Sequence, residues 1–234
     1  MWYTTLVALL VLPGWSADHP AMSRAVAATT QTTSAPSDAP PLRTSLQRLE
    51  RGLVAVQAGD APDVGTERDR ALAATRALLD LSTAWPAASP LVYRRSLHTL
   101  ATVFDVAVRQ APAALPQVLR SLGDDLEDKL EHCRASGGRL GGAVTVHVRT
   151  VQGGGEVRRW QVLYMPKILE VASNATPDLF PQLSSPTNDR LVPGRYLIWA
   201  RQPFTGRTSE RQVLKVGEGR SALEVELPVP PGPP

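Results

Sequence analysis

The chain has 234 residues, 25 Lys and Arg against 22 Asp and Glu, a formal net charge of +3 and 43% hydrophobic residues. This apolar content is sufficient for buried cores and excludes a fully disordered chain, and the length fits one large domain or two small ones. The basic residues are spread along the chain without a concentrated basic face, so the sequence does not indicate nucleic-acid binding.

Residues 1–16 are typical of a signal peptide. An apolar run from Leu6 to Leu12 is broken by a Pro-Gly pair, and it is too short to span a bilayer as a mature helix. The small residues Gly14 and Ser16 favour cleavage after Ser16. We therefore expect an extracytoplasmic protein, periplasmic or secreted, with no stable membrane span after cleavage.

Residues 17–41 form a Thr/Ser/Ala/Pro tract with few large apolar side chains, and we expect a disordered linker there. Residues 230–234 form a Pro-rich tail. The single cysteine, Cys133, excludes an intramolecular disulfide. Because Cys133 lies on an apolar helical stripe, we interpret it as a small buried side chain rather than a nucleophile.

Residues 42–136 carry four helical patterns joined by short Pro- and Gly-containing loops, which predicts an antiparallel four-helix bundle. The four apolar stripes are Leu46, Leu49, Leu53 and Val56; Leu72, Thr75, Leu79 and Ser82; Tyr93, Leu97, Leu100, Phe104 and Ala107; and Leu115, Val118, Leu119, Leu122, Leu126, Leu130 and Cys133.

The hydrophobic period changes from about 3.6 residues to about two after the stretch "GGRLGG", Gly137 to Gly142. Alternation begins at Val144 and returns in later segments, with a "QGGGE" hairpin turn and a "GEG" turn between neighbouring strands. Short strands without intervening helices predict an antiparallel β-sandwich of about seven strands over residues 142–229. The expected fold class is therefore α+β, with two domains divided at the glycines.

The run "LVPGRYLIWA", followed by "RQVLKVGEGRSALEVEL", resembles the carboxypeptidase-regulatory-like (prealbumin-like, transthyretin-like) β-sandwich domains. The resemblance rests on the turn Pro193-Gly194, the core-facing Tyr196 and a closing hairpin that alternates over 223–227. Proline presets φ at such a turn, and glycine tolerates a positive φ. The resemblance implies a module used for holding and binding, and it covers only the C-terminal part.

Three aromatic residues, Trp160, Tyr164 and Trp199, lie in or beside the expected strands and are candidate ligand-binding residues. If the two tryptophans face outward together, they form a stacking platform for carbohydrate. The alternative is that they cover the core.

Asp124, Asp128 and His132 are four residues apart in "DDLEDKLEH" and therefore lie on one face of the fourth helix. Such a face can supply two metal ligands or acid–base groups, and the alternative is a solvated acidic face opposite the leucine stripe. No zinc, phosphate-loop or nucleophile-elbow motif accompanies them, so no metal or cofactor is expected.

Together these patterns favour an exported, non-catalytic interaction or structural protein whose partner is a protein. One alternative is a carbohydrate-binding module that uses the sandwich aromatics. A second alternative is an enzyme with a site between the domains, formed by Asp124, Asp128 and His132.

Overall fold

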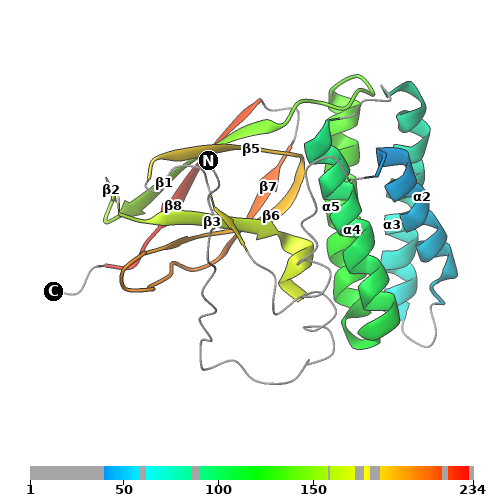
Figure 1. Ribbon diagram of the computed structural model, residues 1–234, viewed down its shortest axis with the longest axis horizontal. Helices are drawn as coiled ribbons and strands as arrows, with labels where there is room; N and C mark the ends of the chain where they lie inside the picture. Colours follow the sequence, from blue (N-terminus) through cyan, green and yellow to red (C-terminus); the bar gives the residue numbers. More distant parts are fainter. Residues whose placement is uncertain are drawn as a thin grey trace, which may run out of the picture.

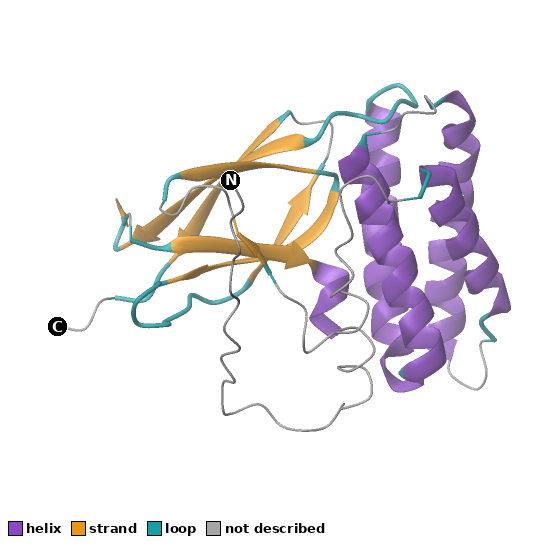
Figure 2. Cartoon of the chain, viewed as in Figure 1, coloured by secondary structure: helices purple, strands orange, loops and turns teal. Residues whose placement is uncertain are grey.

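The computed structural model describes residues 40–57, 62–85, 90–157, 159–171, 177–179, 185–217 and 221–231. Within these residues the chain is α+β, with four α-helices followed by strands in two sheets (Figures 1 and 2), as the sequence predicted. The predicted signal peptide, nearly all of the predicted linker and the last residues of the Pro-rich tail lie outside the described residues.

The helices are α2 (Leu42–Ala55), α3 (Pro62–Leu81), α4 (Leu91–Gln110) and α5 (Leu115–Ala135). The predicted stripes of α2, α4 and α5 are buried almost residue for residue. The stripe of α3 was right only at Thr75: the rest of the buried face is Val64, Ala71, Ala74 and Leu78, and Leu72 and Leu79 are only partly buried. Alanines have short side chains, so this face packs closely on its neighbours and carries little apolar signal in the sequence.

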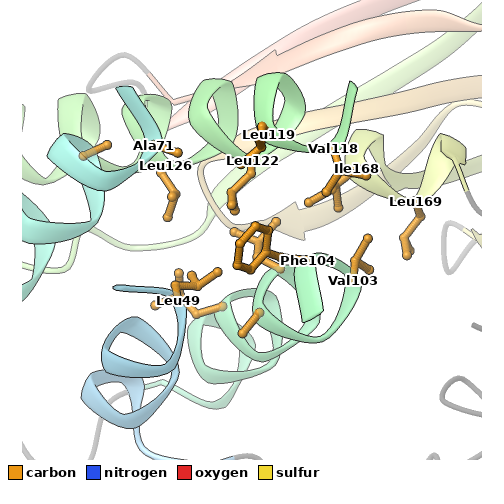
Figure 3. Close-up of a cluster of buried hydrophobic side chains, with 14 of the residues drawn as sticks. Leu49, Ala71, Val103, Phe104, Val118, Leu119, Leu122, Leu126, Ile168 and Leu169 are labelled. Atoms are coloured by element: carbon orange, nitrogen blue, oxygen red, sulfur yellow. The ribbon is translucent and has the colours of Figure 1, made fainter. Parts of the chain in front are cut away.

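The helical core is centred on Phe104, which is fully buried (Figure 3). Leu49 of α2 and Leu122 of α5 pack in the same cluster. Ile168 and Leu169 also enter it from the short 3-10 helix η3 (Lys167–Val171), which directly follows a strand. The helical core therefore includes residues from beyond the predicted domain boundary.

The described strands form two four-stranded sheets that share a second apolar core. In the first, β1 pairs antiparallel with β2 and β5 and parallel with β8; in the second, the order is β4-β3-β6-β7, all antiparallel. The bounds are β1 (Val144–Gln152), β2 (Gly155–Glu156), β3 (Gln161–Pro166), β4 (Asp178–Leu179), β5 (Thr187–Leu191), β6 (Gly194–Arg201), β7 (Gln212–Val216) and β8 (Ala222–Pro228).

The expected closing hairpin was wrong. The chain passes from one sheet to the other between β7 and β8, so these strands do not form a closing hairpin, and β8 runs parallel to β1 from Thr145↔Ala222 onward. Strand β5 has the sequence "TNDRL", which carries no strand pattern. Its middle residues are polar because only Thr187 and Leu191 are buried, and this leaves no apolar alternation to detect.

Strand β6 is buried on both faces, which explains its nearly continuous apolar sequence. Ile198 and its even-numbered neighbours point into the core between the sheets. Leu197 and Trp199 point the other way, into the core shared with the helices. The second sheet therefore separates the two cores, and the helices lie at the end of the sheets where β6 begins (Figure 1). The division into independent domains, 42–136 and 142–229, stays a prediction.

We expect the helices and sheets to unfold in one transition, because separating them would expose Leu197, Trp199 and the side chains of η3 to water. Far-ultraviolet circular dichroism, which reports the helices, and tryptophan fluorescence should have the same urea midpoint. Sheets that keep native fluorescence after the helices have melted would instead show two independent units.

Candidate functional site at the helix–sheet junction

The acidic face of α5 lies against the second sheet. Asp128 is 3% exposed and His132 is 4% exposed, while the side chain of Asp124 is 13% exposed. The interpretation of this face as solvated was therefore wrong. The leucine stripe indicated one buried side of α5, but the helix is buried on a second side as well, where the turn before β6 packs on it.

The centre of this junction is a buried ion pair that holds the turn at 193–195. The Lys129 ammonium lies 2.5 Å from the Asp125 carboxylate and donates a second hydrogen bond, of 2.7 Å, to the carbonyl oxygen of Pro193. The backbone N–H of Arg195 donates to the other oxygen of Asp125 at 3.0 Å. One acid and one base on α5 thus satisfy both polar backbone groups that the turn directs at the helix.

Gly194 lies between these two backbone groups, with φ +147. A Cβ atom at this position would overlap the Asp125 carboxylate and approach the Lys129 ammonium. Glycine is therefore required twice at this turn, for its positive φ and for the close approach of the helix.

The side chain of Arg195 extends the junction. Its Nε lies 2.9 Å from Asp128 and its terminal nitrogen lies 2.6 Å from Asp124. Arg70 of α3 reaches Asp124 from the opposite side, at 2.5 Å, and also pairs with Glu127. Its bonds to Glu127 and Asp124 raise the pKa of Arg70 above its ordinary value. One chain of charges therefore joins α3, α5 and β6.

Lys215 of β7 closes the network, with its ammonium 3.5 Å from Asp128 and 3.2 Å from Glu131. The sequence contains only three lysines, and Lys129 and Lys215 both lie here. Each of Asp124, Asp125 and Asp128 thus has a cationic partner from another turn or element.

His132 and Cys133 lie near the C-terminal end of α5. Burial lowers the pKa of His132, which favours its neutral form. His132 packs tightly on Gly141, where a Cβ atom would overlap the imidazole. Burial raises the pKa of Cys133 to about 11, so its thiol stays protonated near neutral pH. The interpretation of Cys133 as an unreactive buried side chain fits this environment.

Asp124, Asp128 and His132 lie on one face at the junction, where both aspartates are paired with arginine. Among the described residues, no group of three His, Cys, Asp or Glu side chains is placed to bind a metal ion. A groove of about 500 Å³ lies beside the network, between α3 and α5, with Ala73, Ala77 and Leu130 in its lining. Asp124, Asp128 and His132 do not line it.

The aromatic candidates are not brought together. Trp160 is 4% exposed and belongs to the core between the sheets, whereas Trp199 is 6% exposed and belongs to the core shared with the helices. The Arg211 guanidinium covers the Trp199 ring, 4.9 Å from its centroid. Tyr164 is half-buried and donates a hydrogen bond of 3.1 Å to Asp189. The two indoles therefore form no shared exposed platform, because strand alternation directs them into different cores.

No family model matches the chain, and no curated protein matches it either. In the part of the chain that the structure describes, no helix has the length and apolar character needed to cross a membrane.

We expect Gly194→Ala to destabilise the protein by at least about 3 kcal/mol, because it combines backbone strain with loss of the buried ion-pair geometry. Gly206→Ala is the matched control, since Gly206 also has a positive φ, +69, but nothing lies within 4 Å of its added Cβ. The control should cost about 1–2 kcal/mol. Urea denaturation measures both, and equal losses would show that Asp125 and Lys129 do not constrain the turn.

Lys129→Met should cost about 3–5 kcal/mol, because it leaves the Asp125 carboxylate buried without its cation. The double variant Asp125→Asn, Lys129→Met should recover part of that loss. Arg149→Gln is the control, since it breaks the pair with Glu226, in which both side chains are more than half exposed, and should cost less than about 1 kcal/mol. A loss for Lys129→Met as small as the control's would contradict a buried clamp.

Proposed function

We propose that the chain is an exported, non-catalytic interaction or structural protein, in which a helical bundle is fixed on a prealbumin-like β-sandwich of the carboxypeptidase-regulatory-like kind. One observation carries the non-catalytic assignment. The carboxylates best placed for chemistry, Asp124 and Asp128, are each engaged by arginine across the junction and bind structural elements to one another.

The sandwich assignment is supported by two features. Two sheets share a core that includes Tyr196 and Ile198, and the turn at Pro193-Gly194 leads directly into that strand. The Tyr196 hydroxyl donates a hydrogen bond of 2.9 Å to the carbonyl oxygen of Val192, which fixes the turn to the strand that follows it. The family resemblance predicts a binding or scaffolding role, and a protein partner is the proposal that follows from it.

Export is proposed from the first 16 residues. An exported protein with a single cysteine must be stable without an intramolecular disulfide, and here apolar burial in two cores and the ionic junction supply that stability.

Amino-terminal sequencing of the protein recovered from the extracytoplasmic fraction should begin near Ala17.

The enzymatic alternative and the structural role of the junction predict different results in a strain that lacks the gene. Two variants are compared there. Asp128→Asn removes a charge from the junction, whereas Leu122→Val removes one methylene group from the helical core and leaves the junction unchanged. If the junction only holds the fold, both variants restore the deletion phenotype in proportion to the folded protein present. Loss of complementation by folded Asp128→Asn, with Leu122→Val active, would establish a chemical role for the carboxylate and overturn the proposal.

A further inference from the structure

The connection between β6 and β7 carries an unusually exposed aromatic ring. Phe204 is 99% exposed, whereas Val54, which follows it among the large apolar side chains described, is 59% exposed. Single exposed apolar residues are common on protein surfaces. Phe204 is distinguished by the rigidity of the loop that presents it and by the charges around it.

The distal loop, residues 202–211, is held by its own hydrogen bonds. The N–H of Gln202 donates to the carbonyl of Arg207 at 2.8 Å, and the N–H of Gly206 donates to the carbonyl of Gln202 at 3.0 Å. The Thr205 hydroxyl donates a hydrogen bond of 2.7 Å to the side-chain oxygen of Gln202. The Arg207 side chain is tied to the carbonyl oxygen of Pro231 at 2.8 Å. The loop therefore holds Phe204 outward with little ordering entropy left to lose on binding.

The distal loop lies at the end of the sheets remote from the helices (Figure 1). The seven residue steps of β6 from Gly194 to Arg201, at about 3.3 Å each, place it roughly 23 Å from the junction. Binding at Phe204 therefore takes place away from the junction.

The charges around the ring are mainly positive. Exposed Arg201 precedes the loop, Arg207 and exposed Arg211 lie within it, and Glu210 is its one acidic residue. Exposed Arg159 lies at the same end, since it precedes β3, whose first residue pairs with Arg201. The loop that carries the exposed ring therefore also carries or adjoins several arginines, whose guanidinium groups match phosphate.

We propose that the distal loop binds the surface of an anionic phospholipid bilayer, with Phe204 entering the boundary of the acyl chains and the arginines contacting lipid phosphates. A stable protein interface needs about 800 Å² on each partner and a complementary shape, which one protruding ring does not provide. A fluid bilayer accepts a single aromatic side chain without a shaped pocket, and basic residues add attraction to anionic headgroups. The inference goes beyond the proposed function, because it assigns a surface for reversible membrane attachment.

Co-sedimentation of the purified full-length chain tests this, with vesicles of equal parts phosphatidylglycerol and phosphatidylcholine compared with phosphatidylcholine alone. We expect binding to the anionic vesicles that weakens with added salt. Phe204→Ser should lower the partition coefficient about tenfold or more, because it removes the buried aromatic area. Arg159→Gln and Arg201→Gln should each lower it about fivefold, on anionic vesicles only.

The controls are Val54→Ser and Arg51→Gln, which remove an exposed apolar side chain and an exposed arginine from α2, in the helical half. Both should bind as the unmodified chain does, and because all variants share residues 1–39, any contribution from that segment cancels. Phe204→Trp should be quenched by brominated lipid. Unchanged sedimentation of Phe204→Ser, or absence of quenching, overturns the proposal, as does a finding that Phe204→Ser alters self-association but not vesicle binding.

Discussion

The structure depends on the close packing of helix α5 on the turn before β6. At that contact, Lys129 and Asp125 take up the carbonyl of Pro193 and the N–H of Arg195, with Gly194 between them. Backbone polar groups at a turn normally face water, and burying them without partners is costly. The acid and base on α5 remove that cost, so a turn can lie inside the molecule and a helix can lie directly on it.

The chemistry of the junction accounts for the residue types found there. Lysine is rare in this chain, where arginine supplies nearly all positive charge, yet among the lysines and arginines that the structure describes Lys129 is the most buried. A compact ammonium fits between a carboxylate and a carbonyl, whereas the broad guanidinium of Arg195 suits a bridge between Asp124 and Asp128. Because each hydrogen bond fixes direction as well as distance, the network sets the position of α5 along the turn. The apolar contacts above and below it supply burial without that directionality.

The same contact gives the molecule two unlike ends. At one end, helix α5 packs on the start of β6 and on η3, whose Ile168 and Leu169 enter the helical core. At the other, the strands end in an internally bonded loop that presents Phe204 among arginines. A firmly held helical end and a separate exposed loop suit a protein that positions one surface relative to another, in agreement with an interaction role and with attachment at the distal loop.

The sequence by itself determined the α+β class, the four helices, the stripes of α2, α4 and α5 and the alternation of β1 and β6, because these depend on local periodicity and turn chemistry. Only the tertiary structure decided what covers each element. The polar face of α5 looks solvated in sequence because Asp125, Asp128 and Lys129 are charged. Apart from the Asp125–Lys129 pair itself, their partners lie more than sixty residues away, at the turn, β6 and β7. Trp160 and Trp199 look alike in sequence, yet they enter different cores. The parallel pairing of β8 with β1 was also invisible, since strand partners are chosen by packing between distant segments and leave no local periodic signal.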